Sequence, residues 1–326
     1  MRPDFSVLFL TTLIGAGQGL FLALFTVQLL VLAGWLPSPD GHAFFAHGSL
    51  LALALLVGGL VASFFHLGRP ERAWRSAAMW RTSWLAREVI VLPALMGTVL
   101  LFGTAHLAGW KPALVSLPSG LVIDTTVALG TTGALLAFAL FLCTAMIYAC
   151  LPFLREWASP FTVINYTLLG SASGFTLAAA FSTWTAPGAT RFLAGCAFAL
   201  TLLGAISRIA SLVRNARLRP RSTPQTALGI KHPRIVQRSA GFLGGSFNTR
   251  EFFHGRPASV LRTVKWTFLL LAFAAPLALV AFGGPGSSGP VLAMAFVVQY
   301  LGLLAERWFF FAQANHPQNL YYQDVA

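Results

Sequence analysis

Residues 44–65 read FFAHGSLLALALLVGGLVASFF, and residues 85–108 read LAREVIVLPALMGTVLLFGTAHLA. Each stretch is an apolar run of about 20 residues or more, the length that an α-helix needs to cross roughly 30 Å of hydrocarbon. Neither run alternates between apolar and polar residues as the strands of a membrane barrel do. The two runs therefore predict two membrane-spanning helices joined by a polar connection.

The rest of the chain repeats this pattern. Hydrophobic residues make up 56% of the 326 residues and charged residues only 10%, a composition that excludes an ordinary water-soluble globule. The first run is too long for a secretory signal peptide, so we expect it to be retained. We predict an all-α integral membrane protein whose eight transmembrane helices form helical bundles in a single membrane-anchor domain, 1–326. The eight predicted spans are 6–33, 44–65, 85–108, 121–150, 161–183, 190–212, 264–282 and 289–312.

Basic residues are concentrated in two connections that eight spans would place on the same side. The extended basic loop predicted over 208–265 holds twelve Lys or Arg residues, and the connection around 66–84 adds four. Loops rich in Lys and Arg face the cytoplasm, so we expect both termini and the basic loop to be cytoplasmic, in the inner membrane of a bacterium. Topology and anionic lipid account for the net charge of +13 without a nucleic-acid partner.

The connection between the two quoted runs carries the residues of a candidate site. His66 ends one span and Glu88 lies about one turn inside the next, with Arg81 and Trp84 expected on the same helical face as Glu88. One interpretation is structural: an Arg–Glu pair anchors the helix end, and tryptophans mark the membrane interface. The other is a quinone site with His66 and Glu88 as its catalytic acid–base groups. The candidate quinone-binding residues are His66, Arg72, Arg81, Trp84, Arg87 and Glu88.

Other redox groups have no suitable ligands in this sequence. We place none of the seven histidines near the middle of a span, so a bis-histidine haem is not expected. The three cysteines, Cys143, Cys150 and Cys196, lack CxxC spacing and are interpreted as small core residues, not as ligands of an iron–sulfur cluster or another metal. Any electron donor or acceptor for a quinone must then lie in a partner subunit.

The basic loop is longer than topology requires, and loops of more than about 15 residues usually have a function or are disordered. Its segment FNTREFFHG, 247–255, combines aromatic and hydrogen-bonding side chains, which suits a protein interface. The predicted interface residues are Asn248, Thr249, Arg250, Glu251, Phe252, Phe253 and His254.

Three motifs resemble the DmsC/NrfD-like membrane anchors of molybdopterin oxidoreductases: HLGRPERAW at 66–74, SWLARE at 83–88 and ERWFFFAQANHPQNLYY at 306–322. The resemblance implies that the chain binds ubiquinone or menaquinone. It also implies partners: a four-cluster iron–sulfur subunit and a molybdopterin catalytic subunit, which hold the clusters and the molybdenum. The quinone-associated histidine, acid and arginine of the family correspond to His66, Glu88 and Arg72.

The long basic loop departs from the compact dimethyl sulfoxide reductase anchors and resembles the SoeC group instead. That resemblance implies the quinone-reactive subunit of a sulfite-oxidising enzyme, with electrons passing from sulfite to the quinone pool. An anchor that oxidises menaquinol to reduce dimethyl sulfoxide or a related substrate is the alternative. A secondary transporter or a purely structural tether are further alternatives, although the polar clusters lie at one membrane edge and not at the midplane, where transporters bind their substrates.

Overall fold

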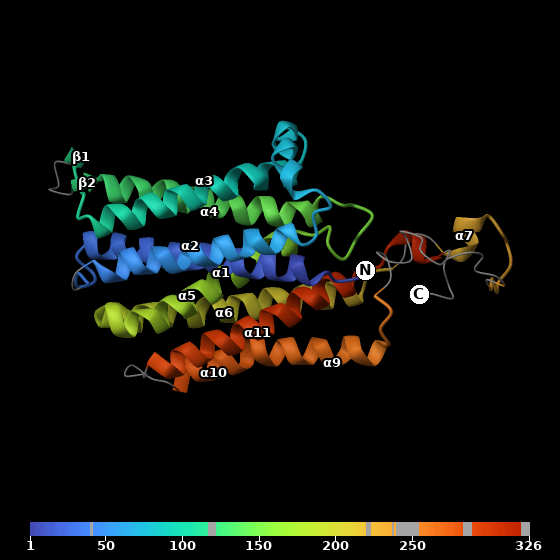
Figure 1. The fold of residues 1–326 in the computed structure, drawn as a ribbon. Coiled ribbons are helices and arrows are strands. Elements are labelled where there is room, and N and C mark those ends of the chain that lie inside the picture. Colours follow the sequence, from blue (N-terminus) through green and yellow to red (C-terminus); the bar gives the residue numbers. More distant parts are fainter. Residues whose placement is uncertain are drawn as a thin grey trace.

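The structure is a computed structural model that describes residues 1–39, 42–116, 122–219, 223–236, 238, 254–282 and 289–320. Long helices run side by side through it, and one of them consists of α9, η2 and α10 in succession (Figure 1). Their bounds are α1 Phe5–Leu32, α2 Ala43–Phe64, α3 Trp84–Leu107, α4 Thr125–Ala149, α5 Pro160–Thr185, α6 Pro187–Ala216, α9 Ala258–Leu269, η2 Leu270–Ala274, α10 Ala275–Phe282 and α11 Gly289–Ala312. The shorter elements are η1 Pro70–Met79, β1 Ala113–Ser116, β2 Val122–Asp124, α7 Pro224–Leu228 and η4 Pro317–Leu320.

The chain is a helical membrane protein, as its composition predicts. In the part that the structure describes, seven helical segments are long and apolar enough to cross a membrane: α1, α2, α3, α4, α6, α9–α10 and α11. The prediction of eight spans is confirmed only to that extent. The helix outside this set is α5, which is 26 residues long but carries buried polar side chains such as Asn165 and Ser173. The antiparallel pair β1–β2 was not predicted.

Helix α5 lies at the centre of the helical array. It packs against α1, α4, α6 and α11, so most of its surface faces protein. Glycines make its contact with α1 close: Gly15 and Gly19 on α1 face Gly170 and Gly174 on α5. A Cβ atom at Gly174 would clash with the backbone of α1 at Gly19. Small residues spaced four apart let membrane helices approach in this way.

The helices form two groups joined by this α1–α5 contact. Helices α1 to α4 pack on one another, while α5, α6, α9–α10 and α11 form the second group (Figure 1). The segment after α4 links the two groups at one end. The indole of Trp157 in this segment donates a hydrogen bond of 2.9 Å to the carbonyl of Phe310 on α11. This arrangement agrees with the predicted helical bundles.

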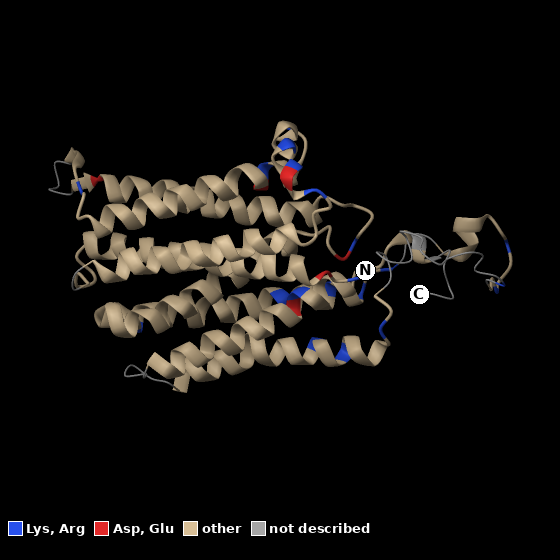
Figure 2. Ribbon diagram, viewed as in Figure 1, with Lys and Arg blue, Asp and Glu red and all other residues tan. Residues whose placement is uncertain are grey.

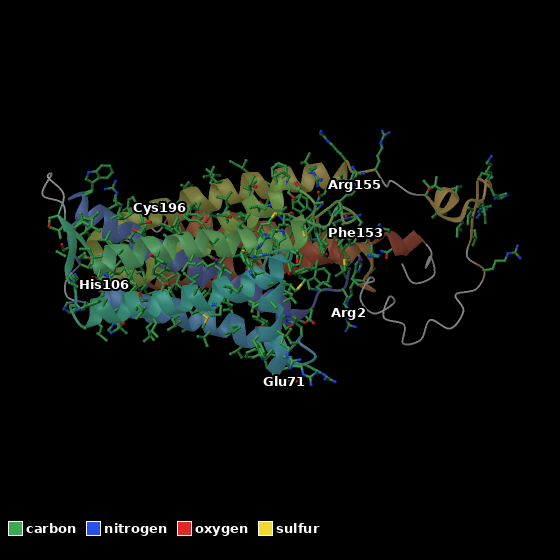
Figure 3. The ribbon with its side chains drawn as sticks, turned by 90° about the horizontal axis from the view of Figure 1, so that it is seen from above. Arg2, Glu71, His106, Phe153, Arg155 and Cys196 are labelled. Carbon is green, nitrogen blue, oxygen red and sulfur yellow. The ribbon has the colours of Figure 1, made fainter. Side chains whose placement is uncertain are left out.

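Most Lys and Arg residues lie toward the end of the bundle where α1 begins (Figure 2). Arg2, Glu71 and Arg155 mark this end, and His106 lies at the other (Figure 3). Four basic residues of the predicted loop lie within helices: Arg208 and Arg214 in α6, and Arg262 and Lys265 in α9. Of these, Arg208 is buried within the bundle. The connection between the long helices therefore spans 217–257, shorter than the predicted 208–265.

The three cysteines differ in their surroundings. Cys143 is buried, as expected of a core residue, and Cys196 is half-buried. The same prediction is wrong for Cys150, which follows the last residue of α4 and is exposed. All three are free thiols.

Candidate functional site

Glu88 is held inside the bundle by the start of α3. The hydroxyl of Ser83 accepts a hydrogen bond from the backbone N–H of Ala86, which caps the helix and places Glu88 just over one turn from its beginning. The Glu88 side chain is buried, and its Oε1 accepts a hydrogen bond of 2.5 Å from the hydroxyl of Thr144 on α4. Glu88 is thus joined to a neighbouring helix by a neutral hydroxyl.

This geometry contradicts the expected Arg–Glu anchor. Because α3 begins at Trp84, Arg81 precedes the helix and does not share a helical face with Glu88. The Arg81 guanidinium lies over the exposed ring of Trp80. Among the described residues, the structure records no ion pair to Glu88.

Arg87 stabilises the turn before α3. Its guanidinium donates hydrogen bonds of 2.9 Å to the carbonyls of Trp80 and Arg81 and lies 4.2 Å from the centroid of the Trp84 ring. Half-buried Trp84 and Arg87 therefore form a rigid polar edge beside Glu88. Arg72 is not part of this edge, since it lies in η1 and is exposed.

His66 is oriented by residues that the sequence did not single out. Its Nδ1 lies 2.9 Å from the hydroxyl oxygen of Ser6, and that hydroxyl donates to the carboxylate of Asp4 at 2.8 Å. The single hydroxyl proton of Ser6 is therefore used on Asp4, so Nδ1–H of neutral His66 must be the donor to Ser6. Nε2 of His66 then has no hydrogen-bond partner among the described residues and can accept a proton.

The charge state of His66 follows from two opposed effects. Partial burial lowers the pKa of His66 below its ordinary value of 6.5, and the nearby carboxylate of Asp4 opposes this shift. The imidazole is therefore mostly neutral at pH 7. A neutral, oriented imidazole at the membrane edge can accept a proton and release it again.

The predicted site residues thus differ in burial. His66, Arg72 and Arg81 are exposed, Trp84 and Arg87 are half-buried, and Glu88 is buried. Different helices hold the two proposed acid–base groups: α1 orients His66, whereas α4 binds Glu88.

Sequence reasoning missed a buried charge cluster in the second group of helices. Arg208 on α6 and Arg307 on α11 both bind Glu306, with Nε–Oε distances of 2.6 Å and 2.5 Å. All three side chains are at most 5% exposed. The available signal was the adjacent pair Glu306–Arg307 inside an apolar run, because a charge at that depth is costly unless it is paired or functional.

A small cavity lined by buried residues lies between α1, α4, α5 and α11. Its volume is about 30 Å³, and its polar lining includes Thr144, the partner of Glu88, and Arg307 of the charge cluster. The ring of Tyr166 also lines the cavity and stacks on the Arg307 guanidinium at 4.2 Å. The cavity therefore lies between Glu88 and the charge cluster.

The predicted protein interface cannot be placed. Asn248, Thr249, Arg250, Glu251, Phe252 and Phe253 lie outside the described residues. His254 is half-buried, its Nδ1 accepts a hydrogen bond from the backbone N–H of Arg256, and burial lowers its pKa. Within the described ranges, no group of three His, Cys, Asp or Glu residues is arranged to hold a metal ion.

Comparison with known proteins identifies relatives of the whole chain. The sequence pattern of the DMSO reductase anchor subunit (DmsC) matches residues 1–231. The chain is also 54% identical, over all 326 residues and the full length of both proteins, to the protein of Allochromatium vinosum described as the C subunit of sulfite dehydrogenase.

Proposed function

The chain belongs to the DmsC family of anchor subunits, and on this premise we propose that it is the membrane anchor of a sulfite dehydrogenase, passing electrons from sulfite oxidation to quinone. The observation that carries the proposal is the 54% identity, without truncation on either side, to the sulfite dehydrogenase protein of Allochromatium vinosum. A match of this extent includes the long basic connection that distinguishes the chain from compact anchors.

The anchor has eight spans in this proposal, with α5 as the fifth. Helix α5 is long enough to cross a bilayer, and its contacts with four other helices remove the need for a uniformly apolar surface. The positively charged end of the bundle then faces the cytoplasm of a bacterial inner membrane.

Partner subunits complete the enzyme. A four-cluster iron–sulfur subunit and a molybdopterin catalytic subunit dock on the cytoplasmic face, and the segment from Asn248 to His254 contributes to this interface. The sulfur substrate is oxidised at the molybdenum centre, so no residue of this chain contacts it. The role of the anchor is to bind quinone where the last cluster can reach it.

The residues at the edge of α3 fit a quinone as substrate. Reduction of a quinone takes up two electrons and two protons, so its oxygens need hydrogen-bonding groups and a proton source. Nε2 of His66 has no partner among the described residues, and the Arg87 guanidinium lies over the Trp84 ring, which gives the site a flat, cationic wall. His66 takes protons from the aqueous edge and passes them to a quinone oxygen. Glu88, buried behind this edge, is the second acid–base group.

A DmsC-type reductase is the second candidate, because the matching family pattern is that of the dimethyl sulfoxide reductase anchor. In that enzyme the same two acid–base groups would take protons from menaquinol while electrons leave toward the clusters. His66 and Glu88 can serve either direction, so the geometry of the anchor does not select one.

The test is a comparison of substrates with the purified complex. The anchor should co-purify with molybdenum and iron–sulfur subunits, and the complex should reduce a quinone analogue when given sulfite. Quinol-dependent reduction of dimethyl sulfoxide without sulfite activity would select the reductase. A solitary protein with ion-dependent uptake would instead indicate a transporter.

A further inference from the structure

Burial of Glu88 raises the question of how protons reach it. Its carboxylate has one described partner, the hydroxyl of Thr144, which donates its proton to Glu88 Oε1. A hydroxyl that donates one hydrogen bond can still accept others. Thr144 also lines the cavity. A group in the cavity that donates a hydrogen bond to the Thr144 hydroxyl would therefore be connected to Glu88.

Two polar groups of the cavity lining, the hydroxyl of Tyr166 and Nη1 of Arg307, lack a well-formed hydrogen bond to any described residue, and both side chains are more than nine-tenths buried. The Tyr166 hydroxyl also lies beside the Arg307 guanidinium and the Tyr148 hydroxyl, so the unmet capacity is clearest at Arg307. Other hydroxyls of the lining are already used: Thr11, Thr12 and Ser173 donate to carbonyls of their own helices. The unmet hydrogen-bonding capacity is therefore concentrated at Tyr166 and Arg307.

The volume and the polar groups of the cavity are suited to a water molecule. A cavity needs roughly 10–15 Å³ and two to four polar partners to hold a water molecule, so about 30 Å³ has room for one or two. A quinone head group is far larger than this. The lining is mainly apolar but includes polar groups of Thr144, Tyr166 and Arg307, so the cavity differs from the wholly apolar cavities that stay dry.

The charge cluster gives a water molecule in the cavity a preferred orientation. Arg208, Glu306 and Arg307 supply two guanidinium groups and one carboxylate, so the cluster carries excess positive charge. A water beside Arg307 turns its oxygen toward the guanidinium and its hydrogens away from it. The hydrogens are then available to acceptors elsewhere in the lining, and Thr144 is one of the lining residues.

We propose that this cavity is a water-binding site, and that Arg307 N–H and Tyr166 O–H donate to the water while the water donates to Thr144, in a hydrogen-bond chain that ends on Glu88. An excess proton that arrives from the aqueous phase as hydronium passes from the cavity water to Thr144 Oγ1, while Thr144 Oγ1 releases its own proton to Glu88 Oε1, so that the water and Thr144 are neutral again after the transfer. The inference rests on the proposed function, since it describes how the buried acid of the quinone site is supplied with protons. Arg307 and Tyr166 are positioning residues in this chain.

A high-resolution cryo-electron microscopy map of the whole complex tests the binding site without reference to activity. We expect density in the cavity within hydrogen-bonding distance of both Thr144 Oγ1 and Arg307 Nη1. An empty cavity overturns the proposal. Density for a halide ion also overturns it, because a halide accepts hydrogen bonds from Arg307 but has no proton to donate to Thr144.

Variants of Thr144 test the proton chain in the same complex. Thr144→Val removes the hydroxyl at nearly constant shape and should lower sulfite-dependent quinone reduction about 100-fold, whereas Thr144→Ser restores the hydroxyl and should retain most of it. Tyr166→Phe keeps the ring on Arg307 and should lower the rate about tenfold. Thr167→Val is the matched control, because Thr167 is next to Tyr166, bonds to its own helix and does not line the cavity.

Reduction of a soluble dye by the catalytic subunits serves as the reference activity and should be unchanged in every variant. Equal quinone rates for Thr144→Val and Thr144→Ser would overturn the chain. A wild-type complex that reduces the dye but not the quinone would refute the proposed function instead, so the two failures are distinguishable.

Discussion

Substituting Glu306 should destabilise the protein far more than its single lost charge suggests. Its carboxylate contacts Nε of Arg208 at 2.6 Å and of Arg307 at 2.5 Å, and all three side chains are buried. Glu306→Gln therefore leaves two guanidinium groups in the bundle without a counter-charge. Removing one partner of a buried pair costs about 3–5 kcal/mol. At about 1.5 °C per kcal/mol for a chain of 326 residues, the melting temperature should fall by about 4–7 °C.

Two further variants make this prediction specific. Arg208→Leu leaves the neutral pair Glu306–Arg307, and its apolar side chain lies near Phe268, so it should cost less than Glu306→Gln. Glu71→Gln is the matched control, because the exposed pair Glu71–Arg72 at 3.8 Å is worth about 0–1 kcal/mol.

The assay is thermal unfolding of the detergent-solubilised protein, followed by tryptophan fluorescence at one pH and salt concentration for all variants. The expected order of melting temperatures is Glu71→Gln highest, then Arg208→Leu, then Glu306→Gln. If Arg208→Leu were as damaging as Glu306→Gln, then charge balance would not be what stabilises the cluster, and the reasoning would fail.

Three other perturbations test the packing, the electrostatics and the orientation. Gly174→Leu should prevent accumulation of folded protein in the membrane, because the leucine side chain would clash with the α1 backbone. Gly195→Leu is the control and should accumulate normally, because the space beside Gly195 is open. Equal yields of the two variants would contradict the close α1–α5 contact. Asp4→Asn removes the carboxylate that raises the pKa of His66, so the limb of the pH–rate profile due to His66 should move to lower pH. An unchanged profile would show that the rate does not depend on the protonation of His66. A cysteine at Ile230, in a background without native cysteines, should resist an impermeant thiol reagent in intact cells, and labelling there would reverse the proposed orientation.

The helices could be predicted because each apolar run is a local property of the sequence. The predicted bounds of α2, 44–65, differ by one residue at each end from the observed Ala43–Phe64. The predicted span 161–183 also coincides with a helix, α5 Pro160–Thr185, but α5 is not among the segments apolar enough to cross a membrane, since a helix surrounded by protein can exchange apolar residues for polar ones. Its contact with α1 depends on glycines more than 150 positions apart in the chain, and no local pattern reveals that pairing.

The candidate site was predictable only in its residue types. Glu88 is bound by Thr144, which is 56 positions away, and His66 is bound by Ser6, which is 60 positions away. Such partners follow from tertiary packing and not from helical spacing. Arg208 was counted with the basic loop although the predicted span 190–212 contains it, because its partner Glu306 is 98 positions away in the last long helix and no local pattern reveals that pairing.

The central claim is that the buried acid of α3 connects this anchor to quinone. It is tested most directly by sulfite-dependent quinone reduction in purified complexes that carry wild-type anchor or Glu88→Gln, each normalised to sulfite-dependent reduction of a soluble dye. Gln keeps the size of the side chain and can still accept a hydrogen bond from Thr144, but it cannot take up a proton. The account predicts equal dye reduction and a loss of quinone reduction in the variant. Normal quinone reduction by Glu88→Gln across the pH range would contradict it.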